Sequence, residues 1–84
     1  MNYEEALKNA QKIIETSIQT IAEIIELNDS WVFLSGSKEK DKLLIDGLNL
    51  RIYKNNRQID EFRIPPVSNI ELIQQGKTIF KIER

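Results

Sequence analysis

Apolar residues recur every three or four positions along residues 3–27, which is the spacing expected for one face of an α-helix. The repeating positions are Tyr3, Leu7, Ala10, Ile14, Ile18, Ile21 and Ile25. Asn2 and Glu5 have the spacing of a capping box at the start of a helix, and Asn28 suits a helix end. The pattern therefore predicts a single N-terminal helix over residues 3–27.

The expected length of this helix has a consequence for packing. Twenty-five residues make a rod of about 37 Å, whereas strands of six or seven residues reach only about 20–23 Å. A small sheet would leave part of the apolar stripe uncovered. The stripe is interpreted first as the core of this domain, and alternatively as a dimer or partner interface along the overhanging end.

Beyond residue 30 the pattern changes to short runs of strand-forming residues. Strands are expected at Trp31–Leu34, Leu43–Ile45, Leu48–Tyr53, Ile59–Ile64 and Thr78–Glu83. Ser68 and Glu71 have capping-box spacing and Gly76 suits a helix end, which favours a short helix over residues 69–75; a hairpin turning at residues 74–77 is the alternative.

Together these elements predict one domain over residues 1–84, with an antiparallel sheet region over residues 31–84. The expected fold class is α+β, with the long N-terminal helix on one face of a small, mainly antiparallel sheet of four or five strands.

The register of the hairpin within residues 48–64 depends on the length of its loop. A two-residue turn at Asn55–Asn56 places Leu50 opposite Glu61, which puts a charge on the apolar face. A loop of three or five residues places Leu50 opposite Phe62, and this second register is predicted because it gives one apolar face. In it Asp60 points to the apolar side near the hairpin tip, either solvated or in contact with a partner.

The chain contains no cysteine and no histidine, so disulfide bonds, thiolate–zinc sites and histidine-based triads are excluded. The three glycines lie far apart and form no phosphate-binding loop. Asp60 and Glu61 are neighbours on one strand, so they point to opposite faces and do not work as an acid–base pair. No catalytic, cofactor-binding or metal-binding residue is assigned, and an enzyme is not expected.

Charge is unevenly distributed along the chain. Residues 1–30 carry two basic and six acidic groups, and residues 31–84 carry ten basic and seven acidic groups, which suggests two faces of opposite sign. No apolar run reaches the ~20 residues that span a membrane, and the acidic N-terminal segment does not resemble a signal peptide. A cytoplasmic location is expected. Abundant Ile, Lys and Asn with few Ala suggest a low-GC bacterium, a mobile element or a phage.

These features predict a small non-enzymatic protein-binding module, for example an inhibitor or immunity-type protein that binds and blocks a larger protein. Its partner is another protein or a second copy, with a homodimer through the long helix as one option. The candidate contact residues are Arg51, Tyr53, Lys54, Arg57, Asp60, Glu15, Glu23 and Glu26.

Two alternative functions are a weak nucleic-acid-binding domain and an accessory subunit of an enzyme. Nucleic-acid binding would use the basic sheet face, with Arg51, Tyr53, Lys54, Arg57 and Lys81. It is disfavoured because a surplus of three charges is small beside the roughly 6–10 phosphate contacts of typical binders.

Overall fold

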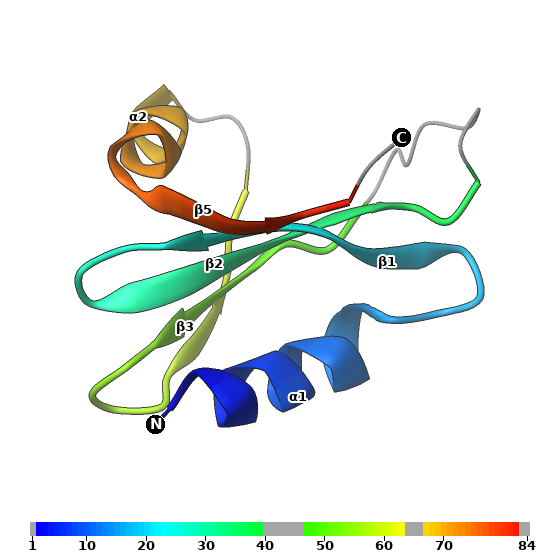
Figure 1. Ribbon diagram of the computed structural model, residues 1–84, viewed down its shortest axis with the longest axis horizontal. Coiled ribbons are helices and arrows are strands. Elements are labelled where there is room, and N and C mark those ends of the chain that lie inside the picture. The colour runs from blue at the N-terminus through cyan, green and yellow to red at the C-terminus, as the bar shows by residue number, and fades with distance from the viewer. Residues whose placement is uncertain (1, 40–46, 64–66, 83–84) are drawn as a thin grey trace.

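The computed structural model describes residues 2–39, 47–63 and 67–82, which form a five-stranded antiparallel sheet and two helices (Figure 1). In chain order the elements are α1 (Tyr3–Ile14), β1 (Gln19–Glu26), β2 (Ser30–Ser37), β3 (Leu50–Tyr53), β4 (Ile59–Glu61), α2 (Val67–Gln75) and β5 (Lys77–Lys81). The strand order is β4-β3-β2-β1-β5, and all neighbouring strands are antiparallel. The general α+β class is confirmed. The strand predicted at Leu43–Ile45 lies outside the described residues.

The prediction of one long N-terminal helix is wrong, because α1 has 12 residues and ends at Ile14. Its start agrees with the sequence pattern, since Asn2 Oδ1 accepts a 2.9 Å hydrogen bond from the Glu5 backbone N–H. After Ile14 the side chains compete with the helix for backbone groups. Thr16 Oγ1 accepts from Ile18 and Gln19, and the Glu15 carboxylate accepts from the Ile21 N–H at 2.8 Å. Asn28 does not end a helix but belongs to the β1–β2 turn.

A β-bulge in β1 explains why the apolar residues of this strand have the spacing expected of a helix. Ile21 pairs with Ser35 and Glu23 with Leu34, so the intervening Ala22 is an extra residue. Ile21 and Ile24 consequently join the same core cluster although three positions separate them. Ile25 belongs to the cluster on the opposite face of the sheet, and Ile18 is 66% exposed.

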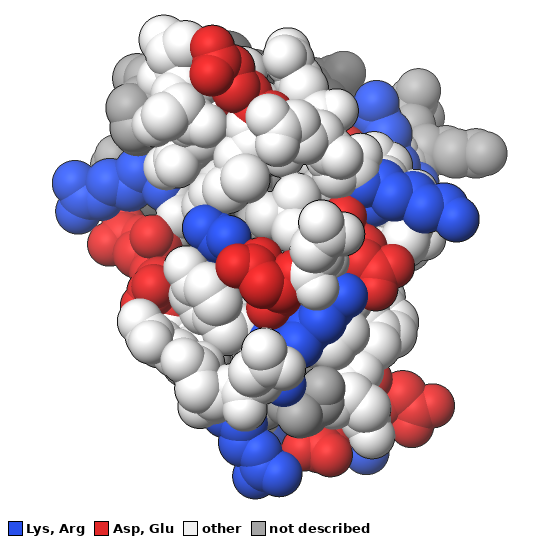
Figure 2. Space-filling view, turned by 90° about the vertical axis from the view of Figure 1, so that its left-hand side faces the viewer, with Lys and Arg blue, Asp and Glu red and all other residues white. Residues whose placement is uncertain are grey.

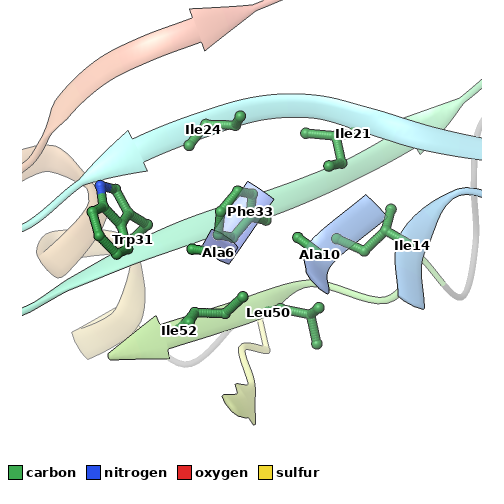
Figure 3. Close-up of a cluster of buried hydrophobic side chains, with 9 residues drawn as sticks. All are labelled: Ala6, Ala10, Ile14, Ile21, Ile24, Trp31, Phe33, Leu50 and Ile52. Atoms are coloured by element: carbon green, nitrogen blue, oxygen red, sulfur yellow. The ribbon is translucent and has the colours of Figure 1, made fainter. Parts of the chain in front are cut away.

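The face of the sheet under α1 holds the larger of the two core clusters (Figure 3). It consists of Ala6, Ala10, Ile14, Ile21, Ile24, Trp31, Phe33, Leu50 and Ile52. The alanines on α1 are fully buried, and their small side chains let the helix lie close against the strands. The short helix therefore packs its apolar stripe against this sheet, and within the described residues α1 has no overhanging end to support the predicted homodimer through a long helix.

The opposite face holds a second cluster of Ile25, Leu27, Val32 and Phe62, on which α2 packs through Leu72 and Ile73. The helix expected at residues 69–75 is confirmed, with bounds Val67–Gln75. Gly76 serves a different purpose from the one expected, because its backbone is not left-handed. A Cβ there would lie 2.7 Å from Leu27 Cδ2 and 2.9 Å from the Glu26 carbonyl oxygen, so glycine permits a close approach of the chain to β1.

The predicted hairpin register is also wrong. Leu50 pairs with Glu61, Arg51 with Asp60 and Ile52 with Ile59. The predicted register requires a single apolar face, whereas this sheet has two. Phe62 enters the second cluster, on the face opposite to Leu50, and its N–H donates to the Asn49 carbonyl at 2.8 Å.

Candidate functional site: a charged hollow beside the β1–β2 turn

A hollow of about 580 Å³ opens where the β1–β2 turn, the end of β3 and α2 approach one another. Its charged residues are Glu26, Asp29, Arg51, Lys54 and Lys77, and we call this set the charged hollow. Leu27 and Leu72 contribute apolar surface to it. Figure 2 shows this end of the molecule, where acidic and basic side chains alternate. The expected separation into two faces of opposite sign is not seen here, because Glu26 of β1 lies beside Lys54, which follows β3, and opposite Lys77 of β5.

Arg51 is the most constrained cation of the charged hollow. Its Nη2 lies 3.1 Å from Asp29 Oδ1, and its Nε donates to Ser30 Oγ at 2.9 Å. The guanidinium carbon lies 4.7 Å from the centre of the Tyr53 ring, within the range of a cation–π interaction. The Arg51 side chain is only 19% exposed. Carboxylate, hydroxyl and ring together hold the guanidinium group in one orientation.

Lys54 ties the end of β3 to the β1–β2 turn. Its Nζ donates to Glu26 Oε2 at 3.0 Å and lies 5.1 Å from the centre of the Trp31 ring. Its backbone N–H donates to the Asp29 carbonyl at 2.9 Å. Residues in and beside the turn therefore set the positions of both the ammonium group and the backbone N–H of Lys54.

The two carboxyl groups of the charged hollow have lowered pKa values. The hydrogen bond from Lys54, followed by its positive charge, lowers the pKa of Glu26, and Lys77 adds a smaller effect. The hydrogen bond from the Ser30 hydroxyl, followed by that from Arg51, lowers the pKa of Asp29. Both groups therefore remain ionised near neutral pH and act as fixed negative charges rather than as proton donors.

The structure brings some of the predicted contact residues together. Arg51, Lys54 and Glu26 line the charged hollow, and Tyr53 lies against Arg51. Arg57 lies in the β3–β4 turn with a positive φ of 59°, and Asp60 on β4 accepts from Gln58 Nε2 at 2.8 Å.

The other two predicted acids lie away from the hollow. Glu15 follows α1, where its carboxylate accepts from Thr20 Oγ1, and Glu23 on β1 accepts from Thr78 Oγ1 at 3.3 Å.

Sequence reasoning missed Asp29, Ser30 and Lys77 as members of this site. The long helix predicted over residues 3–27 hid the position of Asp29 and Ser30 beside β3. Lys77 reaches the hollow only because β5 pairs with β1, with Lys77 opposite Glu26. The available signal is the alternation of apolar and polar residues over residues 19–27, which predicts a strand there if one bulge is allowed.

Within the described residues, no group of three or more acidic side chains is arranged to hold a metal ion. In the same part of the chain, every buried side-chain nitrogen and oxygen has a hydrogen-bond partner. None of the helices in the described ranges is long and apolar enough to cross a membrane. The charged hollow is thus a set of positioned charges and rings at an accessible surface.

Comparisons of the chain with protein-family models, with curated proteins and with solved structures give no match.

Proposed function

We propose that this chain is a small non-enzymatic protein-binding module that acts by binding and blocking a larger protein, in the manner of an inhibitor or immunity-type protein. The long-helix overhang no longer supports this function, since α1 ends at Ile14. The observation that now carries it is the immobilised Arg51, held between Asp29, Ser30 and the Tyr53 ring at the rim of the charged hollow.

Arginine and tyrosine are among the residues that most often dominate binding energy at protein interfaces. A side chain that is already held in place loses little conformational freedom when a partner binds. Arg51 meets this condition, and Leu27 and Leu72 supply neighbouring apolar contact surface. The surrounding charges favour a partner of complementary pattern and steer its approach.

Nucleic-acid binding has less support. The charged hollow contains three basic and two acidic groups, and both acids lie within 3.1 Å of a base. A surplus of one charge is small beside the roughly 6–10 phosphate contacts of typical binders, and the adjacent carboxylates repel phosphate. No feature of the described residues favours an accessory enzyme subunit over an independent module.

Affinity capture from a lysate of the native host, followed by mass spectrometry of the intact complex, tests the proposal. We expect a stoichiometric protein partner whose affinity falls at least about tenfold with Arg51→Ala. Arg63→Ala is the matched control, because Arg63 also pairs with a carboxylate, at 3.3 Å from Glu61, but lies outside the hollow.

Equal capture by both variants would show that the hollow is not the contact surface. Absence of any partner at micromolar concentration would overturn the binding function itself. Retention of single-stranded DNA or RNA at about 50 mM salt would instead support the nucleic-acid alternative.

A further inference from the structure

β5 is an edge strand of the sheet, with β1 on its inner side (Figure 1). All five residues of Lys77–Lys81 are exposed. No strand among residues 2–39, 47–63 and 67–82 pairs with the outer side of β5. The other edge strand, β4, has only three residues, so β5 offers the longer edge.

The backbone of β5 has hydrogen-bonding groups directed away from the sheet. The Ile82 N–H donates to the Ala22 carbonyl at 2.9 Å, so Ile82 faces β1. Antiparallel strands alternate the direction of these groups, so Lys81 directs its N–H and C=O outward. A register shift between the partners of Ile24 and Ile25 makes Ile79 an extra, bulged residue. The outward N–H and C=O groups of β5, such as those of Lys81, can pair with an added strand.

Apolar side chains accompany this edge. Ile79 is 38% exposed and Phe80 is 43% exposed. Phe80 also lines a hollow of about 190 Å³ with Tyr3 and Leu7 of α1 and Ile24 of β1, which we call the α1–β5 groove. Its volume is below the roughly 300–1,000 Å³ of small-molecule sites, so it suits a side chain rather than a whole ligand.

The charges of β5 argue against a second copy of this chain as the occupant. β5 contains two lysines and no acidic residue, so the β5 strand of a second copy would add positive charge and would offer no carboxylate to Lys77 or Lys81.

The same charges favour a foreign strand with acidic ends. Glu26 and Glu23 of β1 lie opposite Lys77 and Lys81 on the inner side. A carboxylate at each end of an added strand would place each lysine between two acids. The middle of that strand would meet Ile79 and Phe80, so apolar residues fit there.

The geometry points to β5 as a docking edge for an extended segment of another protein, acidic at its ends and apolar in its middle. The segment adds as a sixth strand and inserts one apolar side chain into the α1–β5 groove. This inference rests on the proposed function and names the form in which the partner is recognised. Lys77 belongs to both surfaces, so a segment bound along β5 reaches the charged hollow.

The probe is the synthetic peptide acetyl-Glu-Asp-Val-Thr-Phe-Val-Glu-Asp-amide, titrated into the isotopically labelled full chain and followed by amide chemical shifts. We expect saturable shifts in β5 and none in β4. Replacing the four acidic residues with lysine is expected to weaken binding by at least about tenfold. N-methylation of one alternate set of peptide nitrogens should abolish binding, while methylation of the other set leaves it intact.

Matched variants of the two edges locate the site. Ile79→Thr and Lys81→Met are expected to weaken peptide binding several-fold, and Ile59→Thr is expected to have no effect. Ile59 on β4 is a suitable control because it is also 38% exposed. Equal affinity for the acidic and basic peptides, or equal effects of both N-methylated sets, would overturn the inference. A wild-type dimer that is lost with Ile79→Thr would also overturn it, since the occupant would be a second copy.

Failure of this inference can be separated from failure of the proposed function. A native partner that is lost with Arg51→Ala but retained with Ile79→Thr and Lys81→Met would leave the proposed function in place and overturn the docking edge. A partner lost with all three variants, but not with Ile59→Thr, would support both.

Discussion

The ammonium group of Lys54 donates a 3.0 Å hydrogen bond to the carboxylate of Glu26, which links the end of β3 to the end of β1. This pair lies beside the turn that also holds Arg51, Asp29 and Ser30. Contacts between residues far apart in the sequence therefore form the wall of the charged hollow. The contribution of its charged groups to stability can be tested by varying the pH.

Acid is expected to weaken the fold partly through this pair. The pKa of Glu26 is lower in the folded chain than in the unfolded chain, so the unfolded chain binds more protons in the carboxyl range. The resulting stabilisation is complete at neutral pH and is lost as the pH falls below about 4. Lys54→Met should flatten the decline in the free energy of unfolding with acid.

Chemical denaturation between neutral and acidic pH measures that decline. Arg63→Met is the control, because it removes the exposed ion pair between Arg63 and Glu61 of β4, and exposed pairs contribute little to stability. An unchanged acid profile in Lys54→Met would show that the Glu26 pair does not contribute to stability.

Gly76→Ala should destabilise the fold by about 1–3 kcal/mol, because the added methyl group meets Leu27 and the backbone carbonyl of Glu26. Thermal unfolding measures this effect. Gln75→Ala, at the neighbouring exposed position, should change stability by no more than about 0.5 kcal/mol. Equal stability of Gly76→Ala and Gln75→Ala would contradict the close approach of Gly76, between α2 and β5, to β1.

Phe33→Ala should destabilise the fold by about 3–5 kcal/mol, since Phe33 is fully buried at the centre of the cluster under α1. The same substitution at the half-exposed Phe80 should cost less than about 1.5 kcal/mol. Denaturant unfolding compares the two variants directly. A larger loss at Phe80 would contradict the assignment of β5 to an exposed edge.

Glu15→Ala should cost about 0.5–1.5 kcal/mol, because the Glu15 carboxylate accepts from Thr20 Oγ1 and from the Ile21 N–H where α1 passes into β1. Lys8→Ala, at an exposed position within α1, is the control and should change stability by no more than about 0.5 kcal/mol. In the wild-type chain, backbone chemical shifts should be helical to Ile14 and extended from Gln19. Helical chemical shifts through residues 19–26 would instead support the single long helix predicted from the sequence.

The sequence predicted those parts of the fold that depend on local chemistry. The Asn2 cap, the strand around Trp31 and the helix near residues 69–75 follow from capping residues and a run of strand-forming residues, and the structure contains them. The long helix failed because a bulge at Ala22 gives Ile21 and Ile24 a spacing that a helix also produces. Periodicity alone does not distinguish the two cases.

The hairpin register failed for a related reason. Apolar alternation sets the register only when a single face is buried, and Phe62 enters the second cluster instead. The candidate site was predictable only in part. Arg51, Tyr53 and Lys54 follow from one strand and its end, whereas Asp29 and Lys77 join them through pairings that depend on the whole sheet.

The pairing of β5 with β1 has a consequence for how the molecule assembles. Glu23 pairs with Lys81 and Glu26 with Lys77, so the last strand closes onto the first. Pairings this distant in sequence form slowly, because the chain between them must first lose conformational freedom. Until β5 arrives, one side of β1 has no neighbour. We therefore expect the native sheet to form only once residues 77–81 are free of the ribosome.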